Sequence, residues 1–137
     1  MSKSSNSGAQ LHKQRGVTFM EIMIALVIVG ICMAIALPSY RTHQIKSKRA
    51  SAQAHLLEIA QAQQQYLLDA RAYAANLTAL NVTTPTLVST FYTITMSVAS
   101  GPPTFTITAT PRTGTAQATD STLTVNQAGI KTPSDKW

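Results

Sequence analysis

The sequence contains one cysteine among its 137 residues, and few charged or aromatic side chains. Cys32 has no partner in the chain, so an intrachain disulfide is excluded, and cysteine usage does not identify the redox compartment. The five acidic residues are too few and too scattered for a calcium cluster. The spacing of His12, His43 and His55 fits no metal site or catalytic triad. The sequence therefore predicts no cofactor, no metal and no enzyme.

Acidic residues are also scarcer than basic ones, and the resulting excess of positive charge is unevenly distributed along the chain. The formal net charge is +6. Residues 1–16 carry three Lys or Arg and no acid, while the remainder carries eight Lys or Arg against five Asp or Glu. The excess in the remainder is too mild to indicate a nucleic-acid-binding protein by charge alone.

What the chain does have is a long apolar run. From Ile22 to Leu37 there is no charged residue, and extending the run back to Val17 adds only Glu21. A helix of this length crosses a hydrocarbon core of about 30 Å at about 1.5 Å per residue. An acid within such a segment costs at least about 2–3 kcal/mol in mid-membrane and marks a functional candidate. We therefore expect an apolar transmembrane or assembly helix over residues 17–40.

The residues before this run predict a basic leader peptide over residues 1–16. A conventional secretory signal places its small cleavage-site residue after the apolar core, whereas Gly16 precedes it. Cleavage at Gly16 would leave the membrane segment on the mature protein. The alternative is a signal anchor that is never cut, and topology alone leaves both open.

The start of the apolar run resembles the type III signal of type IV pilins and pseudopilins, in the residues Gly16-Val17-Thr18-Phe19-Met20-Glu21. The continuation is similar to the minor pilins of the PilE kind, in Pro38-Ser39-Tyr40 and Lys48-Arg49-Ala50. This resemblance implies that a prepilin peptidase cuts between Gly16 and Val17 and that Val17 is N-methylated. It also implies that Glu21 pairs with the N-terminus of a neighbouring subunit. Pairing would offset the desolvation of both charges in an apolar layer.

Gly30 and Pro38 are the weak points of the expected helix. Glycine costs about 0.5–1 kcal/mol relative to alanine, and proline removes a backbone hydrogen bond. We expect a bend near Pro38, and the resemblance suggests loss of helicity between Gly30 and Pro38 in a filament. An ordinary membrane-helix kink is the alternative.

The basic residues around the apolar run do not decide its orientation. Three Lys or Arg precede the run, and four follow it within residues 41–49. The resemblance implies that the leader is cytoplasmic, and that the protein resides in the bacterial inner membrane before assembly and then in the extracellular pilus. The 41–49 cluster would then lie near anionic headgroups or form a solvated helix face.

Residues 41–77 predict an amphipathic continuation of the helix. Apolar side chains recur at steps of three and four residues, and glycine and proline are absent from the span. The stripe consists of Ile45, Ala52, Leu56, Ile59, Tyr66, Ala70, Tyr73 and Leu77. We expect it to pack on a small sheet.

Residues 78–137 predict a small β domain after a polar connection over 78–89. Apolar and threonine side chains alternate over 92–98 and 105–109, and a shorter strand is expected around Leu123 and Val125. A turn over 126–129 leads into a hairpin. The expected fold class is α+β, with a long N-terminal helix packed on an antiparallel sheet of three to four strands, as in pilins.

These observations predict a structural subunit, a minor pilin, whose partners are other pilin subunits, a prepilin peptidase and the inner membrane. A type II secretion pseudopilin is the first alternative. The second is a DNA-uptake (competence) pilin that binds nucleic acid through Arg112, Lys131, Lys136 or the 41–49 cluster. A membrane-anchored enzyme is the third.

Overall fold

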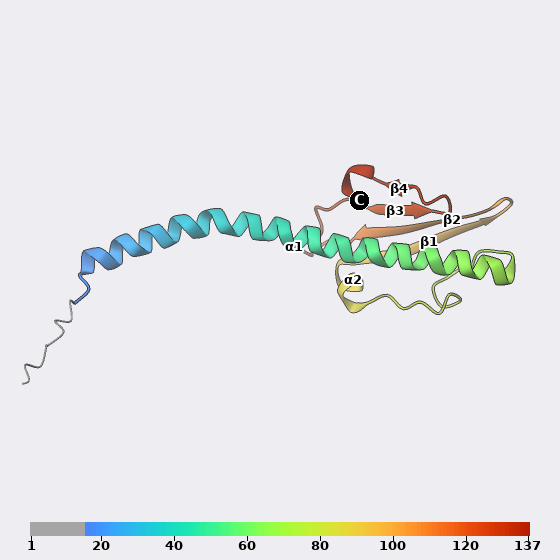
Figure 1. The fold of residues 1–137 in the computed structure, drawn as a ribbon, viewed down its shortest axis with the longest axis horizontal. Helices are drawn as coiled ribbons and strands as arrows, with labels where there is room; N and C mark the ends of the chain where they lie inside the picture. The colour runs from blue at the N-terminus through green and yellow to red at the C-terminus, as the bar shows by residue number, and fades with distance from the viewer. Residues whose placement is uncertain (1–15) are drawn as a thin grey trace, which may run out of the picture. The chain divides into compact units, whose positions relative to one another are not determined.

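The computed structural model describes residues 16–137, so the predicted leader lies almost entirely outside the described residues. The chain forms two compact units, residues 1–38 and 39–137, and each is described by itself. The predicted α+β class is confirmed, with a long N-terminal helix and an antiparallel sheet of four strands. The elements labelled in Figure 1 are α1 (Phe19–Ala70), α2 (Thr86–Phe91), β1 (Tyr92–Ser100), β2 (Pro103–Pro111), β3 (Leu123–Asn126), β4 (Lys131–Thr132) and the 3-10 turn η1 (Ser134–Lys136).

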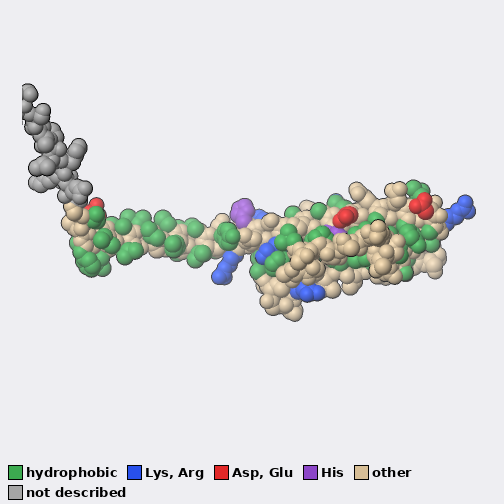
Figure 2. Space-filling view, turned by 90° about the horizontal axis from the view of Figure 1, so that it is seen from below, with side chains coloured by type: hydrophobic (Ala, Val, Ile, Leu, Met, Phe, Trp, Pro, Cys, Tyr) green, Lys and Arg blue, Asp and Glu red, His purple; other side chains and the backbone are tan. Residues whose placement is uncertain are grey.

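The described part of the first unit is the apolar half of α1. The carbonyl oxygen of Thr18 accepts hydrogen bonds from the backbone N–H groups of Glu21 at 3.0 Å and Ile22 at 3.3 Å, which closes the first turn. All side chains from residue 16 to residue 38 are exposed. Hydrophobic groups cover this half of the helix (Figure 2). By length and composition, α1 is able to cross a membrane.

Gly30 and Pro38 both lie inside α1, and helical structure continues through both residues. Neither residue therefore ends the helix. The bend near Pro38 and the loss of helicity in a filament stay predictions.

At its other end α1 stops at Ala70, so the prediction of a helix over 41–77 is wrong at its C-terminal end. Arg71 adopts a positive φ of 55°, a left-handed conformation that commonly terminates helices. Tyr73 and Leu77 still pack against the core, as expected, but they reach it from the loop after the helix.

A buried side-chain amide holds this loop against α1. Gln63 has no exposed area, although its type is rarely buried. Its Nε2 donates to the carbonyl oxygen of Ala74 at 2.8 Å, and its Oε1 accepts from the N–H of Ala74 at 2.9 Å. This reciprocal pair satisfies both backbone groups of Ala74 and turns the chain back along the helix.

The sheet is an antiparallel meander in the order β1-β2-β3-β4. The predicted alternation is confirmed in register, since Ile107 of β2 pairs with Met96 of β1 and with Val125 of β3. The turn after β3 leads to β4, the fourth strand. In that turn the Asn126 Oδ1 accepts the N–H of Ile130 at 2.9 Å, and Gly129 supplies a φ of 73°.

One short helix was not expected. α2 falls largely in the stretch predicted as a polar connection, and it begins after Pro85, whose carbonyl oxygen accepts from Val88 and Ser89 at 2.9 Å each. Proline suits the start of a helix because its φ is preset and it lacks an N–H. Val88 is buried, so α2 closes one end of the core.

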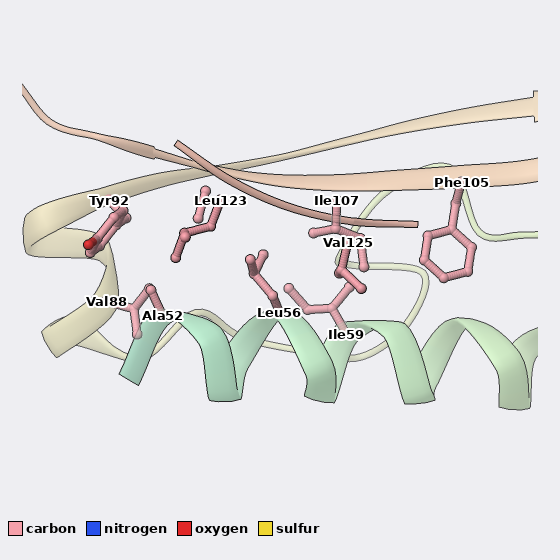
Figure 3. Close-up of a cluster of buried hydrophobic side chains, with 10 residues drawn as sticks. Ala52, Leu56, Ile59, Val88, Tyr92, Phe105, Ile107, Leu123 and Val125 are labelled. Carbon is pink, nitrogen blue, oxygen red and sulfur yellow. The ribbon is translucent and has the colours of Figure 1, made fainter. Parts of the chain in front are cut away.

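The core lies between the second half of α1 and one face of the sheet, with α2 at its end (Figure 3). All ten core residues belong to the unit 39–137, so this unit has a hydrophobic core of its own. They are Ala52, Leu56, Ile59, Val88, Tyr92, Phe105, Ile107, Ala109, Leu123 and Val125.

Candidate functional site

The three residues predicted for processing and assembly lie together at the start of α1. Gly16 and Val17 precede the helix outside any regular element, and Val17 is 66% exposed. Glu21 is exposed in the first turn. The first N–H groups of a helix lack intrahelical acceptors, and a carboxylate in the first turn is stabilised by the positive helix end. The peptide bond and the carboxylate are therefore both accessible.

The residues predicted for nucleic-acid binding do not form one surface, and one of them, Arg49, belongs to a polar network. Arg49 donates through two N–H groups to the carboxylate of Asp120, at 3.0 Å from Nε to Oδ2. The hydroxyl of Tyr92 also donates to this carboxylate, and Gln117 Nε2 lies 2.8 Å from Oδ2. The side chain of Asp120 has no exposed area. The network ties the loop between β2 and β3 to α1.

The network sets the ionisation of its members. Burial by itself would raise the pKa of Asp120, but hydrogen bonds from Arg49, Tyr92 and Gln117 outweigh it and lower the pKa to about 2. Burial, together with the hydrogen bond to Asp120, raises the pKa of Tyr92. The hydrogen bond to Asp120 raises the pKa of Arg49. Asp120 is thus a carboxylate and Arg49 a cation in the folded protein.

This pairing removes Arg49 from the predicted 41–49 binding cluster. Lys48 is half-buried, and its Nζ lies 3.9 Å from the centre of the Phe91 ring. Arg41 and Lys46 are exposed. The cluster is therefore part structural and part accessible surface, a division that the sequence did not indicate.

Arg112 and Lys131 point to opposite faces of the sheet. Arg112 Nε donates to the hydroxyl of Thr93 at 3.3 Å, on the face of β1 that is exposed. Lys131 pairs across the ladder with Val125, whose side chain is buried on the α1 side. Paired residues in adjacent strands share a face. A ligand bound to one face of the sheet would therefore contact only one of these two cations.

Lys131 instead lies over the ring of Trp137, which follows Lys136 in the chain. Lys131 Nζ lies 5.0 Å from the centre of the Trp137 ring, and Trp137 Nε1 donates to the carbonyl oxygen of Thr132 at 3.3 Å. Gln53 of α1 donates to the carbonyl oxygen of Lys136 at 2.6 Å. Contacts of this kind fasten the terminus without a disulfide. We call Lys131, Lys136 and Trp137 the C-terminal cluster.

Within residues 16–137, no group of three or more His, Cys, Asp or Glu side chains is arranged to hold a metal ion. His55, although buried, contacts Glu58 at 2.9 Å and Thr84 at 3.3 Å. It joins α1 to the loop before α2.

Two family models match the chain. One is described as type IV minor pilin ComP, DNA uptake sequence receptor, and matches residues 38–124. The other is described as the prokaryotic N-terminal methylation motif and matches residues 11–37.

Curated relatives resemble parts of the chain. The fimbrial protein EcpB of Eikenella corrodens is 47% identical over 38 residues, which are 28% of this chain and 24% of that protein. The type IV major pilin PilA of Myxococcus xanthus is 34% identical over 62 residues, 45% of this chain and 28% of that protein. The type II secretion system core protein G of Pectobacterium carotovorum is 30% identical over 82 residues, 58% of this chain and 53% of that protein. The chain thus spans about a quarter of the length of the first two and about half of the third.

A solved structure shares the fold. The structure of a type IV pilin from Shewanella oneidensis superposes with a TM-score of 0.53 at 21% identity. The match covers 66% of this chain and 92% of that one.

Proposed function

Because the chain belongs to the type IV minor pilin family described as ComP, DNA uptake sequence receptor, we propose that it is a pilus subunit whose globular unit binds DNA. The resemblance to type IV pilins noted in the sequence is confirmed by this family match. Pilins are structural proteins without enzymatic activity, held in the membrane by the N-terminal helix before they enter the pilus. The observation that carries the proposal is the family match over residues 38–124.

Maturation begins with cleavage between Gly16 and Val17 by a prepilin peptidase, followed by N-methylation of Val17. The exposure of both residues ahead of α1 and the methylation motif over residues 11–37 support this step. Mass spectrometry of sheared surface filaments should find a chain that starts at methylated Val17. An intact Met1 terminus confined to membranes would contradict the proposal.

Assembly then uses Glu21 and the apolar half of α1. A carboxylate in an apolar layer needs a compensating cation, and the amino group created at Val17 of a neighbouring subunit supplies one. Glu21→Gln keeps the shape of the side chain and removes its charge, so we expect membrane insertion to persist and filament yield to fall. Asp69→Asn, which removes an exposed acid from α1 outside the apolar run, is the matched control. Normal filament yield from E21Q would show that the charge is not used.

DNA binding is assigned to the C-terminal cluster. Lys131 is exposed and its ammonium group lies over the Trp137 ring, while Lys136 is half-buried and its ammonium group pairs with Asp135. The ion pair between Lys136 and Asp135, at 2.9 Å, lies on the surface, where solvent screens it, so a phosphate replaces it at little cost. The family match ends at residue 124, so this placement depends on the geometry of the cluster alone.

The unit 39–137 has its own core and is the fragment with which to test binding. Two phosphate contacts predict that the logarithm of the association constant falls with log salt with a slope of about −2. Lys131→Gln together with Lys136→Gln should weaken binding to double-stranded DNA and flatten the slope. Arg112→Gln is the matched control, because it removes a cation from the opposite face of the sheet.

Three results would contradict this assignment. They are an absence of binding at low salt, an unchanged slope in the K131Q/K136Q variant, or a larger effect of R112Q than of that variant. The first would remove DNA binding from the proposal, and the other two would move the site to another surface.

The type II secretion alternative is favoured by one observation, the 30% identity to core protein G over 82 residues. The family model that matches residues 38–124, by contrast, is that of a minor pilin. Deleting the gene should therefore impair pilus-dependent DNA uptake and leave type II secretion intact.

A further inference from the structure

The two edges of the sheet, β1 and β4, differ in how well they are protected from pairing with another chain (Figure 1). An edge strand presents unpaired backbone N–H and C=O groups, and proteins usually protect such an edge with a short strand, a lysine or a proline. The β4 edge has all three protections, because the strand consists of Lys131 and Thr132, and Pro133 follows it. Strand addition at this edge is therefore disfavoured.

The β1 edge has none of these protections. β1 is nine residues long, from Tyr92 to Ser100, and it contains no charged residue and no proline. Its pairing with β2 continues from one end of the strand to the other without an extra residue, so no β-bulge twists the edge away. β1 is therefore a long, uncharged edge strand that can accept another strand.

The ladder between β1 and β2 shows which backbone groups of β1 face outward. In an antiparallel pair, hydrogen-bonded and non-hydrogen-bonded residue pairs alternate. The N–H of Arg112 donates to the carbonyl oxygen of Phe91 at 2.8 Å, so every second residue of β1 counted from Phe91 bonds to β2. The residues between them direct their N–H and C=O groups away from the sheet. The three central ones are Ile94, Met96 and Val98.

A hydrogen bond on the other side of β2 gives the same assignment. The N–H of Gln127 donates to the carbonyl oxygen of Phe105 at 3.2 Å, so the backbone groups of Phe105 face β3. Those of Val98, which pairs with Phe105 in β1, therefore face outward. Within residues 16–137, no loop or turn hydrogen bond uses the backbone of Ile94, Met96 or Val98. Their outward groups are thus available to an added strand.

The side chains of β1 determine which strand would fit beside it. On the face turned away from the core the exposed side chains carry hydroxyl groups, namely Thr93, Thr95 and Ser97. On the face turned toward the core the side chains are apolar and half-buried, namely Ile94, Met96 and Val98. Residues directly opposite each other in antiparallel strands share a face. An added strand would therefore place hydroxyl side chains beside the first row and apolar side chains beside the second.

We propose that β1 pairs with an extended segment of a partner protein, which adds a fifth strand antiparallel to it. The segment is uncharged and alternates threonine or serine with apolar residues. Its apolar residues lie opposite Ile94, Met96 and Val98 and exchange backbone hydrogen bonds with them. The backbone supplies the affinity and the alternation supplies the specificity. This inference goes beyond the proposed function and does not depend on DNA binding by the C-terminal cluster, whose Lys131 lies at the other edge of the sheet.

A short capped peptide, in which three valines alternate with threonines, is the probe. It carries a poly(ethylene glycol) chain at one end, because uncharged alternating sequences self-associate. Its binding to the full-length chain in detergent is followed by hydrogen exchange measured by nuclear magnetic resonance. The amides of Ile94, Met96 and Val98 should exchange rapidly in the free chain and become protected when the peptide binds. The Thr95 amide bonds to β2 and should be protected in both states, so it is the internal reference.

Two methylated peptides test the pairing geometry. In the proposed pairing the N–H groups of the valines face β1, and those of the threonines face away from it. N-methylation of the three valines removes three hydrogen bonds, each of which contributes about a factor of five in affinity, so binding should weaken about 100-fold. N-methylation of the threonines makes the same chemical change on the other side of the peptide and should leave the affinity nearly unaltered.

A pair of variants tests the same edge from the side of the protein. Val98→Pro removes one outward N–H and should weaken binding about five-fold, and proline is tolerated in an edge strand where the N–H faces solvent. Val98→Ala keeps the N–H and should retain most of the affinity. Thermal unfolding shows that both variants are folded. The K131Q/K136Q variant should bind the peptide as the wild type does, whatever its effect on DNA binding.

Three results would overturn the proposal. The first is an absence of added protection at Ile94, Met96 and Val98, and the second is equal weakening of binding by the two methylated peptides. The third is self-association that protects the same amides without any peptide, because the occupant of the edge would then be a second copy of this chain.

Discussion

Replacing Asp120 with asparagine removes the charge at the centre of the polar network and keeps its shape. The pKa of Asp120 is about 2 in the folded protein against an ordinary value of 3.8, because donors from Arg49, Tyr92 and Gln117 outweigh the effect of burial. A difference of this size corresponds to about 2 kcal/mol in favour of the folded, ionised state. Since Arg49 is partly exposed and its interaction is screened, we expect D120N to lose about 1–2 kcal/mol near pH 7.

The ionisation of Asp120 predicts the direction in which the stability of the protein changes with pH. A carboxyl group whose pKa is lowered by folding stabilises the protein above its unfolded-state pKa, and this contribution disappears as the pH falls through the folded-state value. The stability of the wild type should therefore fall from about pH 4 to about pH 2 more steeply than that of D120N, and the two should converge near pH 2.

Urea unfolding of the unit 39–137, followed by circular dichroism at several pH values, measures both effects. Asp135→Asn is the matched control, because Asp135 is exposed and pairs with Lys136 at the surface, so its replacement should leave the free energy of unfolding nearly unchanged. A stability difference between wild type and D120N that stays constant from near pH 7 to about pH 2 would refute the assigned role of the carboxylate.

Three further substitutions test the packing. Gln63→Leu leaves the backbone N–H and C=O of Ala74 without their hydrogen-bond partners and should lower the free energy of unfolding by about 2–3 kcal/mol. Hydrogen exchange at the Ala74 amide should become faster, and unchanged protection there would contradict the role of Gln63. Leu56→Ala should cost about 2–5 kcal/mol in urea unfolding, whereas Leu68→Ala, at an 80% exposed position, should cost little. Gly129→Ala should lower the free energy of unfolding by about 1–2 kcal/mol, measured in the same urea experiment. The cost comes from the φ of 73°, which disfavours alanine, because a Cβ at this position would meet no atom within 4 Å.

The strands were predictable because their signal is local. Threonine alternates with apolar residues along β1 and β2, and the period of two places Ile107 and Phe105 on the buried face without any knowledge of the partners. The long helix was predictable for a similar reason, since its apolar run and the stripe that includes Leu56 and Ile59 need no tertiary information.

The end of α1 and the polar network were not predictable, because distant residues decide them. Alanine-rich residues after Ala70 favour helix locally, but the amide of Gln63 and its bonds to Ala74 override that preference. Asp120 is separated from Arg49 by a long stretch of chain, and a lone acid in a threonine-rich loop carries no periodic signal. The scarcity of acids was the one available indication that Asp120 has a specific role.

The loop between α1 and α2 is anchored at both of its ends, by Gln63 on Ala74 and by His55 on Thr84. When both ends of a loop are anchored, lengthening the loop costs little free energy, because each doubling of its length adds only about 0.6 kcal/mol of closure entropy. An inserted peptide epitope between these anchors should therefore be displayed without unfolding the unit. The two buried side chains thus allow the exposed part of this segment to diversify while Leu77, Leu80 and Val82 keep their contacts with the core.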